Sequence, residues 1–187
     1  MIMKTPEIRS ITSIILLFSA VAVFFYLIAP DGGLLTYETL IFLAFLWLVY
    51  EVKQPAKSKI LNKAILLGLF LMVFDFIIEN GGYFAGLWTS PMTIFPIITV
   101  PIEIIVLAII GGTAWALHLP EKFDKTYAAV EVIVFGFFGA LGEYLLELNG
   151  MMVYTGGWTS IHAFFGYVIT WIILFWVWYG VIKKRKF

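Results

Sequence analysis

The stretch from Gly68 to Trp88, GLFLMVFDFIIENGGYFAGLW, places two carboxylates inside an otherwise apolar run. Asp75 and Glu79 are four residues apart, so a helix would present them on one face. Ionisable side chains within an apolar helix are expensive to bury, and they usually face the interior of a bundle and mark a site. The stretch therefore predicts a helix that carries a functional site near its end.

A second stretch, from Gly136 to Trp158, repeats this pattern as GFFGALGEYLLELNGMMVYTGGW. In both copies the glycine and the first acid are seven apart and the two acids four apart, the acids here being Glu143 and Glu147. An Asn-Gly pair and a tryptophan follow in each copy, and the first acids are offset by 68 residues. This alignment predicts an internal repeat, with units at about residues 60–119 and 127–182.

The composition is typical of an integral membrane protein. Of the 187 residues, 62% are hydrophobic and 13% charged, and the mean hydropathy is +1.00, which is far from the values of soluble domains. Several apolar runs approach the roughly 20 residues that a membrane-spanning helix needs, and alternating strand patterns are missing. The sequence therefore predicts an all-α polytopic membrane helix bundle, a single domain over residues 1–187. The six predicted spans are Ser10–Ala29, Leu34–Val52, Ile60–Asn80, Thr93–Leu119, Tyr127–Asn149 and Ser160–Ile182.

The basic residues predict the orientation of these spans. The connections at residues 30–33, 81–92 and 150–159 contain no Lys or Arg, so all twelve basic residues fall on the other side. The positive-inside rule then places both termini in the cytoplasm, and we expect the chain in the cytoplasmic membrane of a prokaryote. Because the chain has no cysteine, it has neither disulfides nor thiolate metal ligands.

Five carboxylates are expected to gather at the outer side of the bundle as acid and base groups. Asp75 and Glu143 lie about five and six residues before their helices end, or on the order of 8 to 9 Å below the outer boundary. Glu103 lies about nine residues into the fourth span, which Pro96 and Pro101 should kink or begin with a non-spanning turn. The candidate catalytic residues are Asp75, Glu79, Glu103, Glu143 and Glu147.

Such carboxyls would share protons as coupled groups and act as Brønsted acids. A plainer interpretation, in which interfacial carboxylates accept hydrogen bonds from loop amides, is preferred for Glu38 and stays open for Glu79 and Glu147. Glu131 falls near the cytoplasmic side, within reach of Lys125.

Polar and aromatic residues near these acids are candidates for substrate binding. Aromatic faces can stabilise a carbocation, although Trp and Tyr also collect at membrane interfaces for other reasons. We expect His118 to be an interfacial helix end and His162 to be a candidate proton relay. The candidate binding residues are Asn80, Trp88, Tyr144, Asn149, Trp158 and His162.

Neither a metal nor a cofactor is expected in the site. The two histidines fall at opposite ends of the membrane, so they cannot share a metal ion, although the acid pairs with Asn80 and Asn149 could hold Mg²⁺ or Ca²⁺. A retinal Schiff base would need a mid-span lysine, and a diphosphate substrate would need basic groups on the acidic side. The expected partners are the bilayer, an apolar isoprenoid or lipid substrate and a second copy of the chain, and nucleic acid is not among them.

The segments FDFIIENGGYFAGLW and FPIITVPIEIIVLAIIGGTAWAL resemble the lycopene cyclase domain of small membrane carotenoid cyclases, over about residues 68–115. Ile104 stands where that family usually has a second glutamate. The resemblance implies that a carboxyl protonates the end of a polyene without redox change, and a related isoprenoid cyclase or hydratase fits it as well. The matching positions are Asp75, Gly86, Trp88, Pro101, Ile102 and Glu103.

Three functions follow from these patterns. The first is a membrane enzyme of carotenoid or isoprenoid metabolism that cyclises or hydrates an uncharged polyene. The second is a small proton- or cation-coupled transporter that uses the repeated acid pairs, since internal repeats are common in transporters. The third is a lipid-binding or assembly subunit without chemistry of its own.

Overall fold

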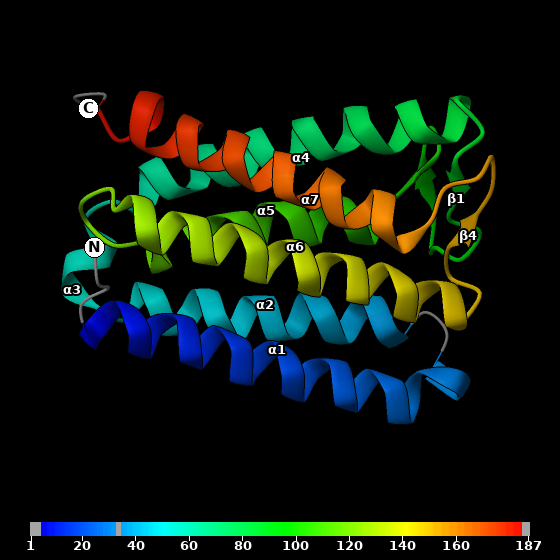
Figure 1. Cartoon of the computed structure of the whole chain (residues 1–187), viewed down its shortest axis with the longest axis horizontal. Helices are drawn as coiled ribbons and strands as arrows, with labels where there is room; N and C mark the ends of the chain where they lie inside the picture. The colour runs from blue at the N-terminus through cyan, green and yellow to red at the C-terminus, as the bar shows by residue number, and fades with distance from the viewer. Residues whose placement is uncertain (1–4, 33–34, 185–187) are drawn as a thin grey trace.

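The computed structural model describes residues 5–32 and 35–184, and most of them are helical. The long helices lie side by side along a common axis (Figure 1). They are α1 (Thr5–Gly32), α2 (Leu35–Val52), α4 (Leu61–Phe84), α5 (Ile102–His118), α6 (Lys125–Leu148) and α7 (Ser160–Trp176). A short helix, α3 (Pro55–Ser58), follows α2, and α7 continues as a π-helical segment, η1 (Val177–Ile182).

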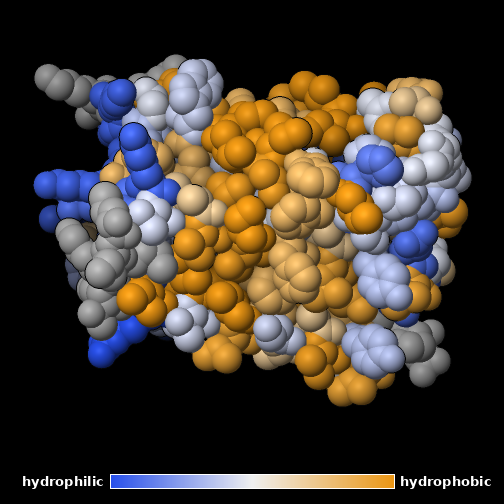
Figure 2. Space-filling model, in the orientation of Figure 1, coloured by the Kyte–Doolittle hydropathy of each residue, from blue (hydrophilic) through white to orange (hydrophobic). Residues whose placement is uncertain are grey.

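Four helices in the described part of the chain are long and apolar enough to cross a membrane. They cover Glu7–Leu27, Leu61–Phe84, Lys125–Leu148 and Ser160–Ile182. Helices α2 and α5, with 18 and 17 residues, are shorter. A broad apolar band separates the two more polar ends of the surface (Figure 2), which is the pattern expected of a protein embedded in lipid.

The two ends of the bundle differ in character. One end holds α3, the start of α1 and the end of η1, and we call it the basic end (Figure 1). The opposite end holds the short strands β1 (Trp88–Thr89) and β4 (Val153–Tyr154), and we call it the loop end. None of the twelve Lys and Arg residues falls within residues 64–121 or 126–182, which include the loop end of α4 to α7.

The predicted span at Thr93–Leu119 is wrong over its first nine residues. Before α5 the chain forms an antiparallel pair of two-residue strands, β2 (Pro96–Ile97) and β3 (Val100–Pro101). Proline lacks a backbone N–H and disfavours helix in the residue before it, so α5 begins only after Pro101. Glu103 therefore lies in the first turn of α5, not deep in a span, while the expected non-spanning turn is present.

Helices α4 and α5 pack closely through small residues. A Cβ added at Gly112 would lie 3.1 Å from the Cα of Gly68. A Cβ added at Gly68 would collide with Thr113 Oγ1 and with the Ile109 carbonyl oxygen. Close approach of backbones through small residues is typical of membrane bundles, which lack a hydrophobic driving force between helices. Helix α6 packs on α7, with Gly136 and Gly139 against side chains of α7, so the chain contains two helix pairs, α4–α5 and α6–α7.

The two helix pairs are joined at the loop end by backbone hydrogen bonds. Strands β1 and β4 pair antiparallel, with Trp88 opposite Tyr154 and Thr89 opposite Val153. The amide of Thr155 extends this link by donating to the carbonyl of Leu87 at 2.8 Å. The two loops that follow the repeated acid pairs therefore contact each other directly.

We predict that Gly68→Ala lowers the free energy of unfolding by about 1–3 kcal/mol, because the added methyl group overpacks the contact between α4 and α5. Gly111→Ala is the matched control on α5, since no atom lies within 4 Å of its added Cβ. Unfolding in mixed detergent micelles, followed by tryptophan fluorescence, measures both. Equal stability of the two variants would contradict the close packing at Gly68.

Candidate functional site

Three of the predicted acids come together at the loop end. Asp75 and Glu79 lie on α4, Glu143 lies on α6, and each interacts electrostatically with at least one of the others. We call these three residues the carboxyl cluster. Because the acids come from both helix pairs, the cluster depends on the pairing of β1 with β4, which holds the ends of α4 and α6 together.

Aromatic donors hold two of the three carboxyls. Trp88 Nε1 donates to Glu79 Oε2 at 2.9 Å, and the Tyr154 hydroxyl donates to Glu143 Oε2 at 2.6 Å. Since Trp88 and Tyr154 face each other across the strand pair, one backbone register positions both donors. Burial, and then the neighbouring carboxylate of Glu143, raise the pKa of Tyr154 well above its ordinary value, so its hydroxyl remains a donor.

Glycines leave space for two aromatic rings beside the acids. The ring of Trp88 lies on Gly82, where an added Cβ would overlap the indole, and the ring of Tyr167 lies on Gly139 in the same way. Tyr167 on α7 is thereby placed near Glu143, one helical turn further along α6, and interacts with it electrostatically. Gly82 is three residues from Glu79, and Gly139 is four residues from Glu143. A glycine at this spacing from an acid in an apolar helix is the sequence pattern that could have predicted an aromatic ring packed beside the acid.

Asp75 differs from the other two members of the carboxyl cluster. Within the described residues its carboxyl forms no hydrogen bond, although Glu143 lies close enough to interact with it electrostatically. It is half-buried between α4 and its neighbours. Asp75 is therefore the member of the carboxyl cluster whose oxygens have no hydrogen-bond partner among the described residues.

Glu103 accepts hydrogen bonds from the loop that precedes α5. Its carboxylate accepts a hydrogen bond from the backbone N–H of Ile94 and another from the hydroxyl of Thr93, both at 2.6 Å. Only 3% of its surface is exposed. Both oxygens are thus used to fix the loop before α5, which is the plainer interpretation considered above for such acids. Tyr37 on α2 interacts electrostatically with Glu103 as well as with the carboxyl cluster, so Glu103 lies next to the site.

Four other predicted residues lie at helix ends around the cluster. The side-chain amide of Asn80 donates to the Phe76 carbonyl at 2.8 Å, and that of Asn149 donates to its own helix at Leu145. The oxygen of the Asn80 amide is also occupied, since Asn80 Oδ1 accepts from the hydroxyl of Thr99 at 2.7 Å. The remaining two are Glu147, which interacts electrostatically with Tyr154, and Tyr144, which is exposed.

Trp158 and His162 continue the aromatic surface that begins at Trp88. The ring centroids of Trp88 and Trp158 are 4.7 Å apart, and the His162 ring stacks on Trp158 at 5.3 Å. His162 Nδ1 is 2.8 Å from the hydroxyl of Thr159, so its polar contact lies within the turn that starts α7. The indole N–H of Trp158 is buried and has no hydrogen-bond partner among the described residues.

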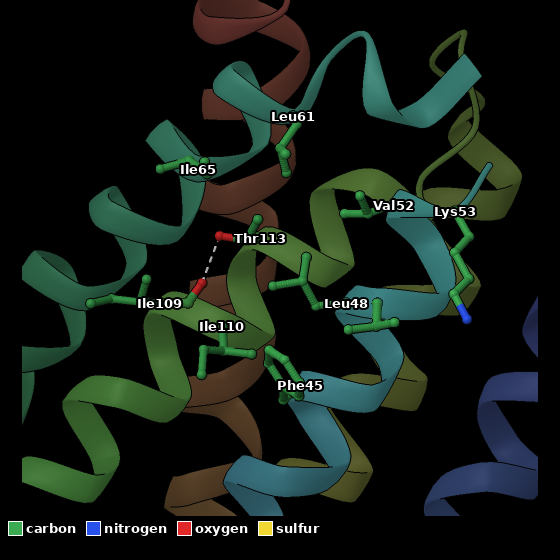
Figure 3. Close-up of a pocket in the computed structure, with 10 residues that line it drawn as sticks. Phe45, Leu48, Val52, Lys53, Leu61, Ile65, Ile109, Ile110 and Thr113 are labelled. Atoms are coloured by element: carbon green, nitrogen blue, oxygen red, sulfur yellow. Dashed lines mark hydrogen bonds between the residues drawn. The ribbon is translucent and has the colours of Figure 1, made fainter. Parts of the chain in front are cut away.

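A separate groove of about 640 Å³ lies between α2, α4 and α5, nearer the basic end (Figure 3). Its walls are aliphatic and aromatic, with Phe45 and Ile65 among the residues that face it (Figure 3). The hydroxyl of Thr113 is bonded to the Ile109 carbonyl at 2.7 Å, which leaves Lys53 as the polar group at one end. The groove suits an apolar chain, and it contains none of the carboxyl cluster.

The basic end contains polar residues that were not among the predicted site residues. His118, expected to be an interfacial helix end, is the last residue of α5 and pairs with Glu51 on α2 at 2.9 Å. Glu131, expected within reach of Lys125, accepts a hydrogen bond from the Tyr127 hydroxyl at 3.1 Å. The sequence did not indicate that Glu51 is buried, because it lies at the end of an apolar run and is followed by several lysines, as an exposed carboxylate would be.

Comparison of the chain with protein-family models, with curated proteins and with solved structures found no match.

We predict that Trp88→Phe lowers the free energy of unfolding by about 1–3 kcal/mol more than Trp158→Phe does. The first change leaves Glu79 Oε2 without its donor, whereas the second removes an N–H that is already unpaired. Trp88 is the more buried of the two rings. Glu79→Gln, which keeps an oxygen acceptor but removes the charge, is therefore measured alone and with Trp88→Phe, by unfolding in detergent micelles, to separate the hydrogen bond from ring burial. Equal losses in the two Trp→Phe variants would show that the Trp88–Glu79 contact is not stabilising.

Proposed function

We propose that the protein is an integral membrane enzyme of isoprenoid or carotenoid metabolism, which rearranges an uncharged polyene by acid–base chemistry at the carboxyl cluster. The observation that carries this proposal is the state of Asp75: its carboxyl is free of hydrogen bonds among the described residues and lies beside two further carboxyls. The distribution of basic residues also supports an uncharged substrate, since none falls in the chain segments that build the site.

The proposed reaction needs one proton donor, one acceptor and no oxidant. Asp75 gives its proton to a terminal carbon–carbon double bond, and a carbon–hydrogen bond and a carbocation form. A second double bond attacks the cation and closes a ring, and a carboxylate then removes a proton from a neighbouring carbon. The product is an isomer of the substrate, and the donor recovers its proton within the cluster.

The remaining carboxyls have distinct parts in this scheme. Glu143 accepts a hydrogen bond from Tyr154, so it is equipped to act as the carboxylate that stabilises the cation and accepts its proton. The faces of Trp88 and Trp158, 4.7 Å apart, supply π-electron density to the same cation. Glu103, with both oxygens occupied, positions the loop before α5 rather than reacting.

The proposed topology has six spans and places this chemistry in the outer leaflet. Helices α2 and α5 are short, but they lie within the bundle alongside the four long apolar helices. If both also cross the membrane, the basic end faces the cytoplasm by the positive-inside rule. The apolar groove between α2, α4 and α5 would then hold part of the substrate, because Ile65 lies about 15 Å from Asp75 along α4.

We predict that expression in a lycopene-producing host changes the chromatographic mobility of the extracted pigment. Asp75→Asn and Glu143→Gln should each reduce product formation by about 10²- to 10⁴-fold, the usual contribution of general acid–base catalysis. Glu147→Gln, four residues from Glu143 and outside the carboxyl cluster, is the control and should retain activity. Unchanged pigment across several polyene hosts would overturn the cyclase proposal.

A proton- or cation-coupled transporter is the second candidate. It is favoured by the meeting of acids from α4 and α6, since repeat-related elements commonly form the binding site in transporters. The matched test is proton flux into proteoliposomes after a pH jump, for the wild-type protein and for Asp75→Asn. Flux that depends on Asp75, without any polyene product, would establish transport in place of the enzyme.

A further inference from the structure

A second polar group lies at the basic end, away from the carboxyl cluster. Its five residues come from four helices: Ser10 on α1, Glu51 on α2, His118 on α5, and Tyr127 and Glu131 on α6. Glu51, Tyr127 and Glu131 are each exposed by 2% or less. Burying two carboxyls in an apolar bundle is costly, and ionisable residues in such positions usually mark a functional site.

These residues form one continuous series of hydrogen bonds. Glu51 Oε1 is 2.9 Å from His118 Nδ1, and His118 Nε2 is 2.6 Å from Ser10 Oγ. Ser10 Oγ is in turn 3.3 Å from the hydroxyl of Tyr127, which donates to Glu131 Oε1 at 3.1 Å. Every link between the two carboxyls is a hydroxyl or an imidazole, which can both donate and accept.

The series has an open end and a closed end. His118 has 15% of its side chain exposed, which makes it more accessible than Glu51, exposed by 3% at its side chain. At the other end, Glu131 Oε2 is buried and has no hydrogen-bond partner among the described residues, and neither has Trp115 Nε1. Tyr179 also interacts electrostatically with Glu131.

Aromatic packing closes the bundle beyond Glu131. The rings of Trp115 and Trp171 are 4.8 Å apart, and those of Phe135 and Trp171 are 4.3 Å apart. Glu143 lies twelve residues further along α6, or about 18 Å away. The series therefore connects the basic end with Glu131 and stops short of the carboxyl cluster.

We propose that these five residues form a proton relay, which carries protons between the basic end and the buried carboxyl of Glu131. A proton taken up by the Glu51–His118 pair leaves His118 Nε2 for Ser10, whose own proton passes to Tyr127. The Tyr127 proton then passes to the Glu131 carboxylate. The pair loses one proton, Glu131 gains one, and Ser10 and Tyr127 end as they began.

The surroundings of Glu51 fit this use. Trp47 Nε1 and Gln54 Nε2 donate to its two oxygens, each at 3.3 Å, which are longer than the 2.9 Å contact with His118. Lys57, the nearby cation, directs its Nζ to the backbone carbonyls of Leu117 and Leu119. Burial lowers the pKa of Lys57, while the negative charge of Glu51 opposes that change. The relay goes beyond the proposed enzyme and does not depend on it.

Infrared spectroscopy of the full-length protein in liposomes tests the relay. The carbonyl band of a protonated carboxyl shifts when its proton is replaced by deuterium, and the band lost in Glu131→Gln belongs to Glu131. After a change from H₂O to D₂O, we expect Ser10→Ala to slow the shift of this band by about tenfold, because one link is broken. Ser10→Thr keeps the hydroxyl and should exchange at the wild-type rate.

Ser13→Ala is the matched control, since Ser13 lies on α1 and bonds only the Arg9 carbonyl, at 2.9 Å. If Ser10→Ala does not fold, as judged by gel filtration, Tyr127→Phe breaks the relay at the next link. Equal exchange rates in Ser10→Ala and Ser13→Ala would overturn the proposal. Failure of Glu131→Gln to remove a band would also overturn it, because Glu131 would then hold no proton.

Discussion

The pairing of β1 with β4 is the contact on which the arrangement of the loop end depends. It joins two loops that are distant in sequence, and its register sets Trp88 opposite Tyr154. Each of these side chains then donates to an acid on the helix that precedes it, Glu79 or Glu143. The strand pair thus places the donors of Glu79 and Glu143 next to each other at the ends of α4 and α6.

Polar groups buried in a membrane bundle must find partners within the protein. Aromatic donors supply some of these partners at both ends: Trp88 and Tyr154 at the loop end, Tyr127 at the basic end. Tyr and Trp suit this purpose because an apolar ring carries a polar tip. Two sets of acids are thus kept apart by packed rings around Trp115, which is itself fully buried.

The sequence predicted the helical membrane class and the acids of the carboxyl cluster, because an apolar run interrupted by Asp75 and Glu79 leaves few other interpretations. It did not predict the start of α5, because hydropathy alone extends the apolar run back through Pro96. The pairing of Glu51 with His118 lay beyond prediction for a different reason. The two residues are 67 positions apart and lie on different helices. The local sequence of either helix does not indicate which other helix it packs against.

The α4–α5 and α6–α7 pairs are connected at both ends, by the chain between α5 and α6 at the basic end and by β1 with β4 at the loop end. Sliding one pair past the other by a helical turn, about 5.4 Å, would break the strand pair. The two pairs therefore form a closed frame that resists shear. The groove lined by Phe45 and Ile65 borders this frame where α2 packs against the α4–α5 pair.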